Sequence, residues 1–159
     1  MRRLWGLGLA VCLLLGGCTS AKGPSPTPAA NSVTAHHDQM ASESMAESDK
    51  RSPALEWLRN TSQHMLWKGD RAAIARHLEE QQKAGASEIW AVDLAKEEGH
   101  EICASFVLVL PQGAARAKLI SLHNEFWKTY LGSEASAEDL KEFTIADEGQ
   151  KYIFYNFDL

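Results

Sequence analysis

The sequence predicts an α+β fold, in which a small antiparallel sheet of three to four strands packs with helices. Three stretches lead to this prediction. Residues 71–84 carry apolar side chains at helical spacing between a capping Asp70 and a stop at Gly85. Residues 102–110 are apolar on both faces of an extended chain, which is typical of an inner strand. Residues 113–131 carry an aromatic-rich stripe at helical spacing, which indicates a further helix.

The first half of the predicted domain begins with a helix over residues 52–67. Ser52 can cap its N-terminus, and Pro53 suits the first helical position. The helix at 71–84 follows, and then residues 88–94 form a strand. Residues 95–101 form a charged turn. Because this link to the strand at 102–110 is short, we expect the two strands to pair as an antiparallel hairpin.

The second half of the domain begins with the helix at 113–131, which Gly132 ends. Residues 136–139 resemble a capping box that starts a short helical turn. We expect a short strand at 143–145 and a terminal strand at 151–157. The order is α-α-β-β-α-(α)-β, which resembles a ferredoxin-like sandwich that lacks its first strand. Residues 52–159, about 108 in number, are long enough for one modest core and form a single domain.

The N-terminus has the pattern of an export signal over residues 1–17. Arg2 and Arg3 precede an uncharged apolar run from Leu4 to Gly17. A membrane-spanning helix needs roughly 20 apolar residues, and this run of about 14 is shorter. It matches the apolar region of a secretory signal peptide.

The end of this run, Leu15-Gly16-Gly17-Cys18, resembles the lipobox of bacterial lipoproteins. The resemblance covers the first 18 to 20 residues only. It implies cleavage before Cys18, acylation of the Cys18 thiol and a membrane anchor of two or three acyl chains. Thr19 resembles the outer-membrane-sorted type, which implies the periplasmic face of the outer membrane in a Gram-negative cell. A plain signal peptide cut elsewhere and an uncleaved anchor remain the alternatives.

Composition and cysteine count limit the function classes. Removal of residues 1–17 leaves 14 basic and 21 acidic residues, a net charge near −7. Such a chain has no basic face for nucleic acid, so we expect no nucleic-acid partner. Cys12 leaves with the signal and Cys18 carries lipid, so Cys103 alone remains and no intramolecular disulfide is expected.

Residues 18–51 are expected to be the lipidated Cys18 followed by a disordered tether rich in Pro, Ser and Ala. The tether contains His36, His37 and Met40, with Met45 further on. Imidazole and thioether groups are soft ligands suited to copper or nickel. The residues therefore favour either a metal-capturing arm or a polar linker that happens to carry two histidines.

The domain offers two further candidate sites, a thiol site and an aromatic surface on the sheet. A thiol site would use Cys103 as nucleophile, His100 or His123 as base and Asp147 as orienter, but a cysteine within an apolar strand is more typical of core packing. The sheet also carries surplus aromatic side chains, at Trp90, Tyr152 and Tyr155. One sheet face therefore either docks a partner or a second copy, or is covered by the first helix; the covered arrangement is favoured.

The sequence as a whole predicts a membrane-anchored lipoprotein with a small non-enzymatic binding or accessory domain in the cell envelope. Its partners would be the membrane, through the lipid on Cys18, and an envelope protein or a second copy. No cofactor is predicted. The metal-capturing lipoprotein is the alternative function, and a thiol enzyme is the third.

Overall fold

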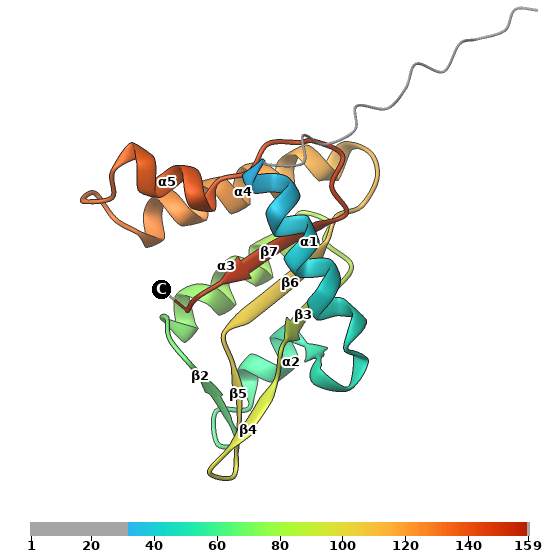
Figure 1. Ribbon diagram of the computed structural model, residues 1–159, viewed down its shortest axis with the longest axis vertical. Helices are drawn as coiled ribbons and strands as arrows, with labels where there is room; N and C mark the ends of the chain where they lie inside the picture. Colours follow the sequence, from blue (N-terminus) through green and yellow to red (C-terminus); the bar gives the residue numbers. More distant parts are fainter. Residues whose placement is uncertain (1–31, 159) are drawn as a thin grey trace, which may run out of the picture.

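A four-stranded antiparallel sheet lies at the centre of the computed structural model, which describes residues 32–158 (Figure 1). Its strands are β1 (Ser52–Pro53), β3 (Ile89–Val92), β6 (Ser105–Val109) and β7 (Tyr152–Asn156), in that spatial order. The expected hairpin is confirmed, because β3 and β6 pair antiparallel. Helices pack on this sheet, so the fold class is α+β as predicted.

The four strands do not have the order of a complete ferredoxin-like sandwich, and the sequence suggested such a sandwich without its first strand. In that arrangement a split βαβ unit separates two consecutive strands by a third. Here β1 and β3 are direct antiparallel neighbours on either side of the helical segment, and the strands lie in chain order across the sheet.

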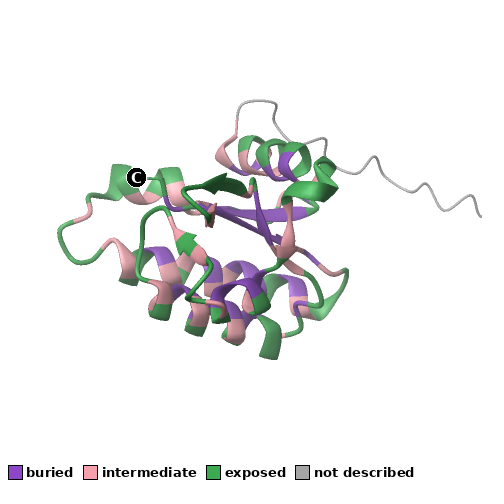
Figure 2. Ribbon diagram, turned by 90° about the horizontal axis from the view of Figure 1, so that it is seen from below, coloured by how far each residue is buried: buried purple, intermediate pink, exposed green. Residues whose placement is uncertain are grey.

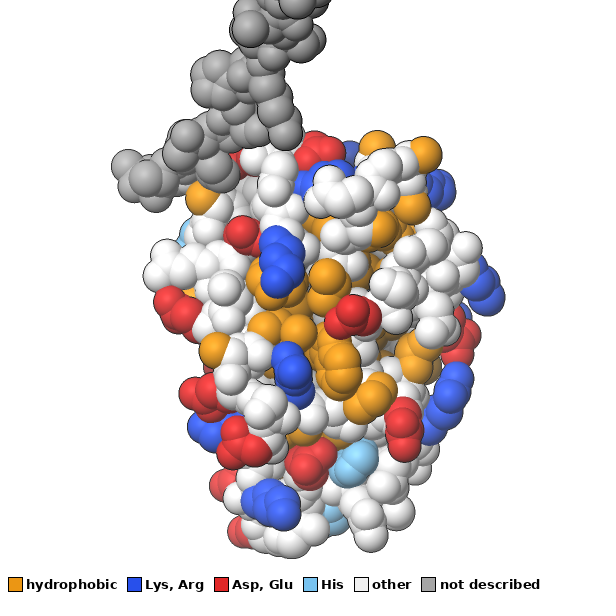
Figure 3. All heavy atoms as spheres, turned by 90° about the vertical axis from the view of Figure 1, so that its right-hand side faces the viewer, with side chains coloured by type: hydrophobic (Ala, Val, Ile, Leu, Met, Phe, Trp, Pro, Cys, Tyr) orange, Lys and Arg blue, Asp and Glu red, His pale blue; other side chains and the backbone are white. Residues whose placement is uncertain are grey.

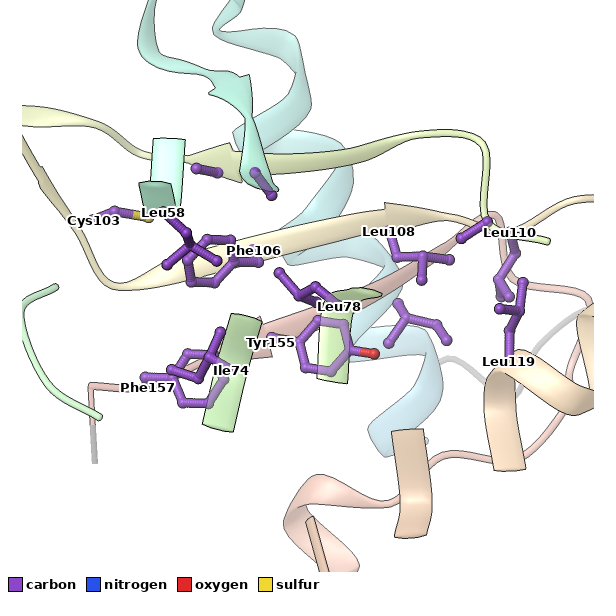
Figure 4. Close-up of a cluster of buried hydrophobic side chains, with 14 of the residues drawn as sticks. Leu58, Ile74, Leu78, Cys103, Phe106, Leu108, Leu110, Leu119, Tyr155 and Phe157 are labelled. Atoms are coloured by element: carbon purple, nitrogen blue, oxygen red, sulfur yellow. The ribbon is translucent and has the colours of Figure 1, made fainter. Parts of the chain in front are cut away.

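The larger core lies between one face of the sheet and the helices α2 (Ala54–Arg59), α3 (Arg71–Lys83) and α4 (Ala114–Tyr130). Helix α5 (Ala137–Phe143) adds to its edge and begins with the capping box predicted at Ser136. Asp70 caps α3, as predicted. Figure 4 shows the apolar side chains of sheet and helices pointing toward one another. We call this cluster the main core; its largest fully buried members are Trp57, Ile74, Leu78, Phe106, Leu108, Leu119, Trp127, Ile153 and Tyr155.

The opposite face of the sheet is covered by a helix that the sequence did not predict. Helix α1 (Val33–Ala46), followed by the short 3-10 turn η1 (Ser48–Lys50), lies across this face, and the sheet is therefore sandwiched between helices (Figure 2). The apolar residues beneath it form a second, smaller cluster, here called the α1 cluster: Ala41, Val92, Val107, Tyr152 and Phe154.

The expected disorder of the tether is therefore wrong for residues 33–46, and the domain begins about 20 residues earlier than predicted. The physical reason is that polar groups dock α1. The Asp38 carboxylate accepts the backbone N–H groups of Lys151 and Tyr152, both at 2.8 Å, and the Ser44 hydroxyl donates to Asp93 at 2.8 Å. Residues 1–31, including Cys18 and the rest of the predicted tether, lie outside the described residues.

The predicted helix over residues 52–67 is also corrected. Helix α2 ends at Arg59, and β2 (His64–Leu66) follows. Side chains satisfy the carbonyl groups at this end. Arg71 donates to the carbonyls of Leu58 and His64, both at 2.7 Å, and the Trp57 carbonyl lies 2.8 Å from the His64 ring nitrogen Nδ1. These contacts replace the intrahelical bonds that a longer helix would need.

A second, three-stranded sheet divides the predicted strand at 102–110. It has the order β2, β5 (His100–Cys103), β4 (Ala95–Glu97), with β2 parallel to β5, and it extends at one end of the molecule (Figure 1). The predicted charged turn is thus the β4–β5 hairpin, whose central residues Glu98 and Gly99 both have positive φ, 49° and 87°. Such angles suit a tight hairpin turn.

The short strand predicted at residues 143–145 is absent from the structure described for this region. The Asn124 side chain instead bonds both backbone groups of Ile145, accepting from its N–H at 3.0 Å and donating to its carbonyl at 2.9 Å. A side chain thus takes the place of a neighbouring strand. Within residues 32–158, the helices are all too short or too polar to cross a membrane.

Candidate functional site

A cavity of about 430 Å³ lies between α1, α5 and β7, and it is the best candidate for a binding site. Its volume falls within the range of small-molecule sites, roughly 300–1,000 Å³. Its walls are mainly apolar and aromatic side chains from four elements: Val33, His37, Met40, Trp127, Phe143 and Phe154. Three of the residues singled out in the sequence, His36, His37 and Met40, line this cavity.

Aromatic rings give the cavity a defined shape. The Trp127 and Phe143 ring centroids are 4.6 Å apart with an interplanar angle of 33°. The His37 ring meets Phe154 edge to face at 6.4 Å. Trp127 belongs to the main core and Phe154 to the α1 cluster, so the cavity lies where the two clusters meet.

His37 is a neutral imidazole with one unused nitrogen. Burial, and then the neighbouring His36, lower the pKa of His37, while a contact with the Glu142 backbone raises it by less. Its Nδ1 atom is buried and has no hydrogen-bond partner among the described residues.

The indole N–H of Trp127 is a second buried polar group without a hydrogen-bond partner. Its side chain is 1 % exposed, and its indole N–H has no acceptor within residues 32–158. The other three tryptophans of this part of the chain all donate to carboxylates: Trp57 to Glu101 at 2.7 Å, Trp67 to Asp158 at 3.1 Å and Trp90 to Glu88 at 3.3 Å. Buried polar groups without a partner are rare, so this one requires an explanation.

His123, in α4, is a second buried histidine with one unpaired ring nitrogen. Its Nε2 lies 2.9 Å from the Phe143 carbonyl, and its Nδ1 is buried without a partner among the described residues. Burial lowers its pKa to about 3, so it is neutral. The His123 imidazole therefore holds the C-terminal end of α5 through the Phe143 carbonyl.

The predicted metal ligands converge only in part. The His36 and His37 rings lie 6.3 Å apart by their centroids, and Met40 joins them at the cavity. Met45 lies elsewhere, against the α1 cluster and within 3.9 Å of the Arg51 guanidinium. Within residues 32–158, no group of three His, Cys, Asp or Glu side chains is placed to hold a metal ion.

The three aromatic residues predicted to bind a partner do not share one free surface. Tyr155 is fully buried in the main core, where its hydroxyl lies 3.0 Å from His77 Nε2 and 2.9 Å from Gln81 Nε2. Tyr152 is buried beneath α1. Trp90 stays half-buried, with Arg51 stacked 5.0 Å from its ring centroid. Sheet pleating sends Tyr152 and Tyr155 to opposite faces.

The residues of the hypothetical thiol site each have other partners. The Cys103 thiol donates to the carbonyls of Ser105 at 3.0 Å and Val92 at 3.6 Å, and burial raises its pKa to about 12. Asp147 accepts from Arg116 at 2.7 Å, and His123 bonds to Phe143. His100 lies in β5, half-buried. At neutral pH the thiol is protonated and is a poor nucleophile.

Sequence reasoning missed two polar groupings. One is a groove of about 700 Å³ between α3 and α4, where His77 stacks on Phe126 at 4.2 Å and meets Tyr155 from β7. The other is the stack of His64 on Trp57 at 4.9 Å, with Glu101 accepting the indole N–H of Trp57. No sequence pattern connects residues so far apart in the chain.

The exposed apolar surface is limited. Figure 3 shows one face on which apolar side chains gather at the centre and charged side chains of both signs surround them. The large apolar side chains most exposed in the described part of the chain are Met40, Met65 and Trp67. Met40 is the one that lies at the rim of the α1–α5 cavity. Apolar surface is therefore accessible beside the cavity.

Comparisons with known proteins returned nothing: no protein-family model, curated protein or solved structure matches this chain.

Proposed function

We propose that this protein is a lipid-anchored protein of the bacterial cell envelope whose α+β domain serves as a non-enzymatic binding or accessory module. The observation that carries the proposal is the lipobox-like sequence Leu15-Gly16-Gly17-Cys18 after a short apolar run. A single acyl chain holds a protein only marginally at a membrane, whereas two or three chains hold it stably. Cys18 is the residue that would carry them.

The early start of the folded domain supports a position close to the bilayer. Only residues 19–31 separate Cys18 from the first described residue, Ser32. Thirteen residues span at most roughly 45 Å when fully extended. The α1–α5 cavity, to which Ser32 contributes, would therefore lie close to the membrane surface.

A binding role fits the chemistry of the described residues better than catalysis does. The cavity is lined mainly by apolar and aromatic side chains, which is typical of a site that binds a small molecule. The only thiol of the described chain is buried and protonated. A test is the reaction of the folded protein with a thiol reagent, where rapid modification of Cys103 would contradict a purely structural role for this residue.

Lipid attachment is tested by feeding cells an alkyne-tagged fatty acid and isolating the full chain. The tag should appear on the wild-type protein, and Cys18→Ala should remove it and release the protein from the membrane fraction. Cys12→Ala is the matched control, because Cys12 lies in the part that the signal peptidase removes, and it should leave labelling unchanged. Membrane-bound, unlabelled wild-type protein would overturn the anchor.

Metal capture is the second candidate, because His36, His37 and Met40 line one cavity. Imidazole and thioether groups together suit copper. Equilibrium dialysis of the full chain with copper or nickel, beside Met45→Leu and Met40→Leu variants, tests it. Micromolar or tighter binding that Met40→Leu weakens and Met45→Leu leaves intact would support a site at the cavity, and weaker binding would remove this function.

A further inference from the structure

We propose that the free edge of β7 binds an extended, apolar segment of a partner protein, which joins the central sheet as an added strand and lies in the α1–α5 cavity. This inference names a partner for the binding role proposed above and rests on that role, but not on the lipid anchor. Four observations carry it: the direction of the β7 backbone groups, the position of the cavity, the protection of the other sheet edges and the chemistry of the lining.

The hydrogen-bond pattern at the two ends of β7 shows which of its residues bond to β6. β6 is the only strand beside β7 within residues 32–158, so β7 is an edge strand. Leu110 donates to the Lys151 carbonyl, and Phe157 donates to the Ala104 carbonyl, both at 2.9 Å. Hydrogen-bonded pairs alternate with non-hydrogen-bonded pairs in an antiparallel ladder. Residues 153 and 155 therefore also bond to β6.

The residues between them, Tyr152, Phe154 and Asn156, direct their backbone N–H and C=O groups away from β6. The Tyr152 N–H confirms this direction, because it donates to Asp38 of α1 at 2.8 Å. The N–H and C=O groups of Phe154 and Asn156 have no hydrogen-bond partner in the described part of the chain. Phe154 is 5 % exposed, and buried backbone groups are nearly always paired in proteins. The open edge at these two residues therefore calls for a partner backbone.

The α1–α5 cavity lies beside this open edge. Trp127 belongs to the main core on one face of the sheet, and Phe154 belongs to the α1 cluster on the other face. A cavity lined by both lies beyond the edge strand that separates the two faces, so the free groups of Phe154 and Asn156 are directed into it. Met40, Glu142 and Asn156 line the cavity and are exposed, so it is open to solvent.

The other sheet edges in residues 32–158 have features that prevent strand addition. β1 is two residues long and includes Pro53, which has no N–H group. At β2 the His64 N–H donates to the Asn60 carbonyl, and the His64 carbonyl accepts from Arg71. β4 is fully exposed and carries Lys96 at its centre, and a charged edge residue opposes pairing. The C-terminal half of β7 lacks such protection.

The lining of the cavity indicates which side chains the partner segment carries. Successive residues of an added strand point to opposite faces of the sheet. Phe154 and Met40 lie on one side of the cavity, and Trp127 and Phe143 lie on the other, so apolar side chains suit both directions. β-branched residues pack well in such a strand. Glu142 is the only carboxylate of the lining, and lysine and arginine are absent from it, so basic ends complement the site.

The flanking helices favour a single strand over a second folded copy. α1 lies on one side of the β7 edge and α5 on the other, and both form walls of the cavity. A second copy would present its own β7 between the same two helices, and pairing of the two edges would bring four helices into contact. An extended segment can enter between α1 and α5 without this obstruction. Addition of a strand to a free sheet edge is a known mode of peptide recognition.

The main test measures amide exchange in the ¹⁵N-labelled full chain, held in phosphatidylcholine nanodiscs. The probe is a short synthetic peptide with valine and isoleucine at its centre, a lysine at each end and blocked termini. Without the peptide, the amides of Phe154 and Asn156 should exchange faster than those of Ile153 and Tyr155, which bond to β6. Saturating peptide should slow exchange at Phe154 and Asn156 by about tenfold or more and leave Ile153 and Tyr155 unchanged.

A matched peptide separates backbone pairing from side-chain packing. It has the same side chains, with N-methyl groups on a pair of successive central residues, so that neither of its edges keeps all its N–H groups. It should bind about tenfold more weakly or worse, because hydrogen bonds to β7 are lost. The affinities are measured by calorimetry, with protein-free nanodiscs as the blank.

Two substitutions at one position test the edge from the protein side. Asn156→Pro removes an outward N–H and takes no bond from the β6 ladder. Asn156→Ala keeps that N–H and is the matched control, because both variants lose the side-chain bond to the Asp158 N–H. Peptide affinity should fall about tenfold in Asn156→Pro, the value of one net hydrogen bond, and stay near wild type in Asn156→Ala. If Asn156→Pro does not fold, the exchange measurement and the N-methylated peptide test the wild-type chain directly.

Equal affinity for the two peptides, or no binding of the unmethylated peptide, would overturn the proposal. Peptide bound without slower exchange at Phe154 and Asn156 would also overturn it and would leave the binding role of the cavity in place. Slow exchange at both amides without peptide, increasing with protein concentration, would assign the edge to a second copy instead. None of these outcomes affects fatty-acid labelling at Cys18, so a failure here is distinguishable from a failure of the anchor.

Discussion

The two faces of the central sheet are covered in different ways. The face toward α2, α3 and α4 is held by burial of large apolar and aromatic side chains, with Phe106, Leu108 and Tyr155 fully buried. The face toward α1 has a small apolar cluster to which the helix contributes only one fully buried residue, Ala41. Hydrogen bonds add to the attachment: Asp38 and Thr34 accept backbone N–H groups, and Ser32 and Ser44 donate to carboxylates.

This difference predicts two levels of stability. Burial of a large apolar side chain contributes about 1.5–3 kcal/mol, whereas one net hydrogen bond contributes about 0.5–1.5 kcal/mol. The main core should therefore open only with global unfolding, and α1 should open locally at lower cost. Because α1 forms one wall of the candidate cavity, its opening also controls access to the site.

Phe106→Ala should have the largest effect on stability. Phe106 is fully buried in the main core and contacts the rings of Trp57 and Phe157 edge to face, at 6.3 and 6.0 Å. Its truncation leaves a cavity and should lower the free energy of unfolding by about 3–5 kcal/mol, measured by urea denaturation. Phe154→Ala on the opposite face is the matched comparison and should cost less; an equal or greater loss would remove the distinction between the faces.

Acid should destabilise the main-core face through His77. Burial lowers its pKa in the folded state to about 4, against 6.5 for the ordinary group, so the unfolded chain binds the proton more readily between these values. Stability is full above pH 6.5 and falls as the pH drops toward 4, by roughly 2 kcal/mol between pH 7 and pH 5. His77→Gln should make the urea midpoint depend less steeply on pH over this range, and the remaining dependence comes from buried His123, whose pKa is lowered to about 3. An unchanged pH dependence would contradict the assignment to His77.

Asp38→Ala should release α1 without unfolding the main core. The Asp38 carboxylate accepts two backbone N–H groups at the start of β7, and hydrogen bonds to charged groups contribute about 1.5–3 kcal/mol. Hydrogen exchange should accelerate in α1 and stay slow in α3 and β6. Gln39→Ala, at the exposed neighbouring position, is the control. Uniform acceleration over the whole domain would show that α1 and the main core unfold together.

Ser136→Ala should have the smallest effect, confined to α5. Ser136 and Asp139 form a reciprocal capping box, with hydrogen bonds of 3.1 and 2.8 Å. Loss of the cap should cost about 1 kcal/mol and raise amide exchange in residues 137–143. Exchange unchanged in α5 would mean that packing on α4 alone fixes this helix.

Local signals predicted the elements of the main-core face well. Asp70 caps α3 through the N–H groups of Ala72 and Ala73, and the alternating apolar residues of β6 lie on the two faces that the sequence indicated. Both signals depend on near neighbours in the chain. The predicted strand at 102–110 was wrong at Ala104, because the chain there passes from one sheet to the other, which no local pattern records.

The candidate site was predicted only in fragments. His36, His37 and Met40 attracted attention as soft ligands, and the structure places them beside Trp127, Phe143 and Phe154, which the sequence assigned to other roles or to none. Residues 33–46 have the composition of a polar linker, because their three alanines and two serines do not form an apolar stripe. The groups that dock α1 are polar, and their partners lie about 50 to 115 positions away.

The sequence by itself determined the caps of α3 and α5, the stops of α3 and α4 and the inner position of β6, because each depends on nearby residues alone. Only the tertiary structure decided that α1 folds, that Tyr155 pairs with His77 and that Trp127 and His37 line one cavity. These features arise from hydrogen bonds and packing between distant segments, and their free energy exists only once the segments meet.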